Sequence, residues 1–157
     1  MVRVEEFVEQ ALYGPDGFYE TGGRAGRRGA SFVTSVETGP LFGAVVAHAL
    51  DTWWRDAGEP DEWLVVDAGA GPGTLARTIR AAAPDCSDAL RLVNVERSAA
   101  QRALHDPADV SSAELPTQAD VILANELLDN LPFGIEEQVD GQWVPVEVAE
   151  DGTTTPD

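Results

Sequence analysis

Polar side chains follow three separate apolar runs of this chain, and their types suit the binding of a polar ligand. Asp67 ends the first run, Glu96 ends the second, and Asn125-Glu126 follow the third, with Asp129 three residues further on. Short apolar runs of this kind predict buried strands, and ligands of open parallel sheets lie outside the carboxyl ends of the strands. We therefore expect these side chains to gather around one ligand.

A glycine-rich turn follows the first of these acids. Gly69, Gly71 and Gly73 alternate with small residues after Asp67, and a helix-like stretch begins at Thr74. Backbone without side chains at a helix N-terminus lets main-chain amides approach a polar ligand closely. A dinucleotide turn requires G-x-G-x-x-G, whereas here the third glycine comes one residue early, and the Lys of a phosphate-binding P-loop is missing. The pattern favours a bound ligand over the alternative of a bare connecting turn.

The spacing of the second acid suits a nucleoside ligand. Glu96 lies 23 residues after Gly73, and the two oxygens of a carboxylate can accept hydrogen bonds from both hydroxyls of a ribose. The alternative is a solvated acid at a strand end. Glu126 and Asp129 would share one face if their turn is helical, and they are either substrate contacts or a capping acid and a solvated one.

The elements that must position these residues alternate between strands and helices. Helices are predicted at 74–83 and 98–104, and strands at 63–67, 90–96 and 121–124, with a weaker strand near 110–115. This order predicts an α/β fold with a mostly parallel, Rossmann-like sheet.

The two ends of the chain add further elements. Apolar spacing predicts helices at 2–13 and 40–55, the second capped by Thr34 or Ser35. Near the C-terminus, two strand-like runs flank Asp140-Gly141 and predict a β-hairpin. We therefore expect three segments, which are a helical and loop segment packed on the core (1–60), a ligand-binding core (61–150) and a disordered tail (151–157).

Composition excludes several classes of function. The 157-residue chain has a net charge of −18, its ten basic residues are all Arg, and none follows Arg102. Such a chain repels phosphate backbones, so we expect no nucleic-acid partner. Cys86 lies in a predicted loop where no structural role is expected, and the two histidines lack metal-ligand spacing. Without a membrane-length apolar run or a basic leader, we expect a cytoplasmic protein with no membrane partner and no metal.

The acid and glycine turn resemble the first motif of class I S-adenosylmethionine (SAM) methyltransferases. Methyl transfer from a sulfonium is an in-line displacement, so the protein must align the donor with the acceptor and exclude water. It needs no metal and no covalent intermediate. An arginine guanidinium as acceptor would require carboxylates that orient it by bidentate pairing. Glu126 and Asp129 are the best placed for that task.

Five segments, in matching order, resemble the MidA family, the bacterial relatives of the mitochondrial complex I assembly methyltransferase. They are residues 7–19, 31–47, 65–76, 93–98 and 122–133. The resemblance covers nearly the whole chain. It implies a class I methyltransferase with SAM as its cofactor and a protein substrate, since the characterised member of the family methylates a protein arginine.

The resemblance also implies roles for particular residues. Asp67 and the three glycines would hold the methionine half of SAM, Glu96 would hold the ribose, and Thr34 and Ser35 would lie near the cofactor. The catalytic residues would be Asn125 beside the methyl group, with Glu126 and Asp129 at the acceptor.

Two departures from the family leave alternatives open. Ala30-Ser31 replaces the family's Gly-Asp, and this chain is much shorter than its relatives. The chain would then be a fragment, a truncated paralogue, or one completed by dimerisation into a homodimer. Two other functions compete with the enzyme. One is a truncated, non-catalytic binding or assembly protein; the other is an NAD-dependent oxidoreductase, which the early third glycine disfavours.

Overall fold

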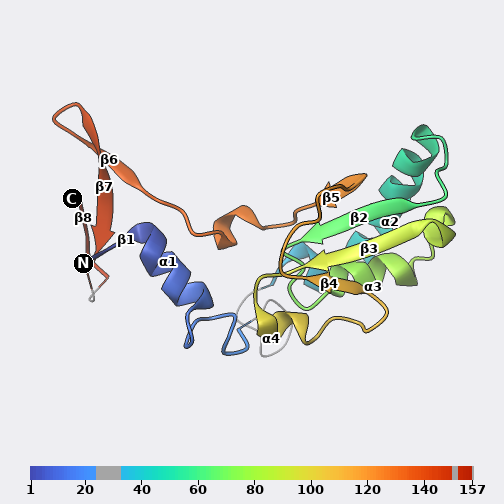
Figure 1. Ribbon diagram of the computed structural model, residues 1–157, viewed down its shortest axis with the longest axis horizontal. Helices are drawn as coiled ribbons and strands as arrows, with labels where there is room; N and C mark the ends of the chain where they lie inside the picture. Colours follow the sequence, from blue (N-terminus) through green and yellow to red (C-terminus); the bar gives the residue numbers. More distant parts are fainter. Residues whose placement is uncertain (24–32, 150–151, 157) are drawn as a thin grey trace.

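The computed structural model describes residues 1–23, 33–149 and 152–156. The Ala30-Ser31 departure from the family lies outside the described residues. The described chain forms two parts, a parallel sheet with its helices and a smaller antiparallel sheet with α1 (Figure 1). Within these residues no helix has the length and apolar character needed to cross a bilayer.

The larger part is a four-stranded parallel sheet in the order β4-β3-β2-β5. Its strands are β2 (Trp63–Ala68), β3 (Leu90–Val95), β4 (Val110–Ser112) and β5 (Val121–Leu123). The central strand β2 is covered on both faces, and Val65 and Val66 are fully buried. Burial on both faces explains the continuous apolar run, and the predicted α/β, Rossmann-like sheet is confirmed.

Two helices, α2 (Pro40–Asp56) and α3 (Thr74–Ala81), pack against one face of this sheet. They approach closely at Gly43, where a Cβ would lie 2.1 Å from Thr78 Oγ1. The core on this face is formed by Ala47, Leu50, Trp63, Val65, Leu75, Ala76, Ile79, Cys86, Ala89, Leu90 and Leu92.

Two local predictions about this part were wrong. The helix α2 is not capped by Thr34 or Ser35, because the 3-10 helix η1 (Ser35–Thr38) intervenes and Gly39 occupies the N-cap. Cys86 lies in the 3-10 helix η2 (Asp85–Asp88) and is only 1% exposed. Its small apolar side chain is part of the core, so it has the structural role that its loop position did not suggest.

The smaller part joins the beginning of the chain to its end. The predicted hairpin is confirmed as β6 (Glu136–Val139) and β7 (Gln142–Val148). Its two turn residues both have positive φ, 50° at Asp140 and 82° at Gly141, as a tight two-residue hairpin turn requires. Strand β7 also pairs with β1 (Val2–Arg3) and with β8 (Thr154–Pro156).

This pairing corrects the predicted division of the chain. The helix α1 (Val4–Tyr13) packs on β7 rather than on the parallel sheet, because Val4 and Val8 cover the apolar side chains Val146 and Val148. The predicted disordered tail contains β8, since the free edge of β7 supplies hydrogen-bond partners to a threonine-rich segment. Segment 1–60 is therefore shared between the two parts, and it contributes α2 and Val36 of η1 to the core of the parallel sheet.

Two short elements connect the sheet to the site. The helix α4 (Ala99–Arg102) follows β3, and its N-cap Ser98 accepts a hydrogen bond from the Gln101 N–H. The 3-10 helix η3 (Leu128–Asn130) follows β5. Both lie at the carboxyl ends of the parallel strands.

Candidate functional site

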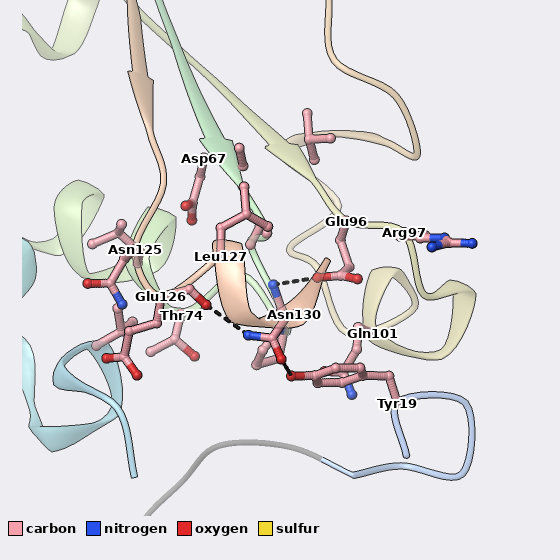
Figure 2. Close-up of a pocket in the computed structure, with 18 of the residues that line it drawn as sticks. Tyr19, Asp67, Thr74, Glu96, Arg97, Gln101, Asn125, Glu126, Leu127 and Asn130 are labelled. Carbon is pink, nitrogen blue, oxygen red and sulfur yellow. Dashed lines mark hydrogen bonds between the residues drawn. The ribbon is translucent and has the colours of Figure 1, made fainter. Parts of the chain in front are cut away.

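A cavity of about 440 Å³ opens at the carboxyl ends of the parallel strands. Its walls come from the ends of β2 and β3, the segment after β5, the stretch around η1, and two tyrosines near the end of α1. Figure 2 shows Asp67, Glu96, Leu127 and Asn130 around this space. This is the edge of the sheet where the sequence pattern predicts a ligand.

The glycine turn forms one wall. Gly69, Gly71 and Gly73 all have positive φ, at 75°, 52° and 74°. Gly69 and Gly71 line the cavity, and a Cβ at Gly69 would lie 2.8 Å from Leu127 Cδ1. A Cβ at Gly71 would meet nothing, so the apex of the turn is open to an approaching group.

The third glycine has a different setting from the one predicted. Gly73 is the N-cap of α3 and is not among the described residues that line the cavity. A Cβ there would lie 3.3 Å from both Asn94 Nδ2 and His105 Cδ2. The geometry at Gly73 allows α3 to start close to these two side chains, which is a packing requirement rather than a ligand contact.

Glu96 lies against the glycine turn, as its spacing predicted. The Gly71 N–H donates to Glu96 Oε2 at 2.9 Å, and the Ser98 N–H donates to Oε1 at 2.8 Å. The residue is 8% exposed and lines the cavity. Each carboxylate oxygen has a second lone pair, so both can still accept a hydroxyl group.

Asp67 is the most strongly perturbed acid of the cavity wall. It is 3% exposed. Burial, together with the negative charge of Glu96, raises the pKa of Asp67 to about 7. Burial is the larger cause, because it disfavours the charged carboxylate, and the nearby negative charge of Glu96 adds to the rise in pKa. Asp67 therefore exchanges its proton near neutral pH.

The segment after β5 only partly follows the prediction. Asn125 and Glu126 line the cavity, but Asp129 is not among the described lining residues. Glu126 has a φ of 52°, which interrupts any helix, and η3 starts only at Leu128. Glu126 and Asp129 therefore do not share a helical face, and the predicted carboxylate pair is not formed.

The two residues expected near the cofactor behave differently from each other. Thr34 lines the cavity, whereas Ser35 is not among the described lining residues. The Ser35 N–H instead donates to Glu126 Oε1 at 3.5 Å. Ser35 thus contacts the wall of the site through Glu126.

Asn130 and two tyrosines form a network that the sequence argument missed. The Tyr19 hydroxyl donates to Asn130 Oδ1 at 2.5 Å, the Tyr13 hydroxyl donates to the Asn130 carbonyl at 2.7 Å, and Asn130 Nδ2 donates to the Glu126 carbonyl at 2.8 Å. The rings of Tyr13 and Tyr19 are stacked, with centroids 5.6 Å apart. The only signal in the sequence was the family-like segment 7–19, which contains both tyrosines but gave no partner for either ring.

The same network has a definite protonation state and a charged neighbour. Burial, with further contributions from Tyr13 and nearby acids, raises the pKa of Tyr19 to about 12, so its phenol remains a donor at neutral pH. The Arg97 guanidinium lies 4.4 Å from the centroid of the Tyr13 ring and pairs with Glu9. Glu96 and Glu126 add negative charge to the wall, as does Asp67 when it is ionised, which favours a cationic ligand.

Comparison with known families identifies the class. Residues 45–155 match the family described as "Putative S-adenosyl-L-methionine-dependent methyltransferase". This match covers more than half of the chain, which therefore belongs to that family. The resemblance found in the sequence is confirmed, and with it the Rossmann-like class I fold and the kind of cofactor that the family uses.

Individual relatives agree with this assignment. The chain is 28% identical, over 92% of its length, to the mitochondrial protein arginine methyltransferase NDUFAF7 homolog of Drosophila melanogaster. It is also 28% identical to a Burkholderia thailandensis protein crystallised with S-adenosyl-homocysteine, with a TM-score of 0.73 over 98% of this chain. A second crystal structure from the same organism is 24% identical over 98% of this chain, has a TM-score of 0.69, and supports the fold alone. The chain spans only 40% to 44% of the length of these relatives.

Proposed function

We propose that this chain binds SAM in the cavity and transfers its methyl group to a protein acceptor, namely an arginine side chain. The observation that supports this most directly is the contact between the Gly71 N–H and Glu96, two residues that both line the cavity. The bound cofactor would supply an activated methyl group on a sulfonium. The protein has to bind the cofactor, align it with the acceptor and exclude water.

The residues present fit such a cofactor. Gly69 and Gly71 offer main chain without side chains, which suits close contact with the methionine half. Glu96 is held in place by two main-chain amides and keeps lone pairs for the ribose hydroxyls. Thr34 also lines the cavity, and Asp67 places a titrating carboxyl near the glycine turn.

Of the two acids predicted to orient the acceptor, only Glu126 is among the described residues that line the cavity. Asn125 and Glu126 remain the residues proposed to orient the acceptor, because both line the cavity, and Asp129 is omitted. Glu126 is positioned by Asn130, which is itself held by Tyr13 and Tyr19. The choice of arginine rests on the acidic wall and on the described activity of the Drosophila relative.

Binding is tested by calorimetry of the purified chain with S-adenosylhomocysteine, and with NADH as the competing ligand. At a concentration 100 times its Kd, a ligand stabilises the folded state by about 2.7 kcal/mol, so a rise in Tm should accompany binding. Glu96→Ala should weaken the affinity by about tenfold or more. Glu136→Ala, an exposed position on β6, is the matched control. Binding of NADH alone, or of neither ligand, would refute the proposal.

Transfer is tested separately with methyl-labelled SAM and an arginine-rich protein, followed by identification of the modified side chain. Methylarginine in the acceptor supports the proposed reaction. Tight binding of S-adenosylhomocysteine with no transfer to any protein would refute catalysis and leave a cofactor-binding protein. A cytoplasmic location, a homodimer, and the absence of nucleic-acid and membrane partners remain predictions.

A further inference from the structure

The peptide groups of Gly71 are held from two sides by two side chains. Its N–H donates to Glu96 Oε2 at 2.9 Å, and its carbonyl oxygen lies 2.8 Å from His105 Nε2. The other ring nitrogen, His105 Nδ1, lies 2.8 Å from the Ser111 hydroxyl oxygen on β4. The histidine is 9% exposed, so its ring is fixed between the glycine turn and the edge strand of the sheet.

These contacts determine the direction of the hydrogen bonds. A carbonyl oxygen only accepts, so His105 Nε2 must carry the proton that it donates to Gly71. In the neutral ring Nδ1 is then an acceptor, and the Ser111 hydroxyl donates to it. The result is one chain of hydrogen bonds, in which the Ser111 hydroxyl donates to His105 Nδ1 and His105 Nε2–H donates to the Gly71 carbonyl.

Gly71 benefits from such support because it has no side chain that could hold it at the apex of the turn. It has a φ of 52°, and the space where a Cβ would lie is open. A glycine in this setting has more conformational freedom than any other residue, and ordering it on ligand binding would cost affinity. The two hydrogen bonds restrict the plane of its peptides before any ligand arrives.

We propose that His105 is a positioning residue for the cofactor, and this inference rests on the proposed function. His105 is not among the described residues that line the cavity, so it acts through Gly71 rather than by touching the ligand. Nor does it belong to a metal-binding group within the described chain. Its role is to hold the Gly71 carbonyl so that the adjoining N–H stays directed at Glu96 and the open face of the turn stays available.

Two substitutions of similar size separate the hydrogen bond from the bulk of the ring. Glutamine can place its amide nitrogen near the position of Nε2, whereas asparagine reaches only as far as Nδ1. We expect His105→Asn to weaken binding of S-adenosylhomocysteine by about three- to tenfold, and His105→Gln to retain most of the affinity. His48 lies exposed on α2, so His48→Asn is the matched control. Calorimetric Kd values are compared with denaturant unfolding of each variant.

The tautomer gives a second readout that does not depend on the ligand. The chain has only two histidines, so a long-range ¹⁵N–¹H spectrum is readily assigned with the two Asn variants. We expect a protected Nε2–H signal that disappears in His105→Asn and persists in His48→Asn. An Nδ1–H ring at His105 would overturn the inference.

The outcomes separate this inference from the proposed function. If the wild-type chain binds S-adenosylhomocysteine and His105→Asn binds it equally well, the inference fails while the proposed function stands. If the wild-type chain binds none, both fail. Should His105→Asn not fold, Ser111→Ala decides, because it removes the anchor of the ring without changing the ring. An affinity reduced by about twofold or more supports the inference, and an unchanged affinity overturns it.

Discussion

Replacing Asp67 with asparagine tests the electrostatics of the site directly. The carboxyl is 3% exposed, and burial together with the charge of Glu96 raises its pKa from an ordinary 3.8 to about 7. Between pH 3.8 and about pH 7, the folded chain keeps a proton on Asp67 that the unfolded chain releases. The stability contributed by this proton is complete below pH 3.8 and is lost as the pH rises through 7, so the free energy of unfolding falls over that window.

The size of the effect follows from the same two values. One pKa unit corresponds to about 1.4 kcal/mol, so ionised Asp67 costs the folded state about 4 kcal/mol above pH 8. About 3 kcal/mol of that cost develops between pH 4.5 and 8.5, because the unfolded chain has begun to ionise at the lower value. Asparagine has nearly the same shape and cannot ionise. Any packing cost of the substitution is equal at both pH values and cancels in the comparison.

Urea unfolding of Asp67→Asn and wild type at pH 4.5 and 8.5 measures this directly. We expect the stability of the variant relative to wild type to rise by about 3 kcal/mol from the lower to the higher pH. The exposed Asp61→Asn is the control, and Glu96→Gln should reduce the pH dependence because it removes the neighbouring charge. A difference between Asp67→Asn and wild type that stays constant over this range would refute the argument from burial.

Three further predictions concern the core. Gly43→Ala should lower the free energy of unfolding by about 1–3 kcal/mol, because the new methyl group would overlap Thr78; equal or greater stability would show that the helices can separate at no cost. Asp51→Ala should lower it by about 1–3 kcal/mol, since Asp51 accepts hydrogen bonds from the N–H groups of Asp85 and Cys86 at 3.0 and 2.9 Å; a change near zero in a denaturant titration would contradict this. Cys86 should react with a thiol reagent only as fast as the protein opens, because it is 1% exposed and burial, aided by Asp51, raises its pKa to about 11; rapid labelling of the native chain would rule out its place in the core.

Local patterns were sufficient for the parallel sheet and for half of the site. The run at β2 indicated burial on both faces, and Asp140-Gly141 indicated the hairpin, because each signal is contained in a few consecutive residues. The contact between Glu96 and the Gly71 amide followed from sheet topology, since neighbouring parallel strands end at one edge.

The rest of the site depends on contacts between distant parts of the chain. The bonds from Tyr13 and Tyr19 to Asn130 join residues 117 and 111 positions apart, and no local pattern encodes them. The left-handed backbone at Glu126 is unusual for a residue with a side chain, so a helical turn was the natural expectation. Strand β8 was missed because its stability comes from its partner β7 and not from its own sequence.

The pairing of β1 with β7 has a consequence for the order of folding during synthesis. The ribosome releases the parallel sheet, residues 63–123, well before the strand that α1 needs as its support. Until residues 146–148 emerge, Val4 and Val8 have no apolar partner in their final positions. Tyr13 and Tyr19 are therefore expected to reach Asn130 only after residues 146–148 have emerged, so the nascent chain forms its parallel sheet first and closes this wall of its cavity later.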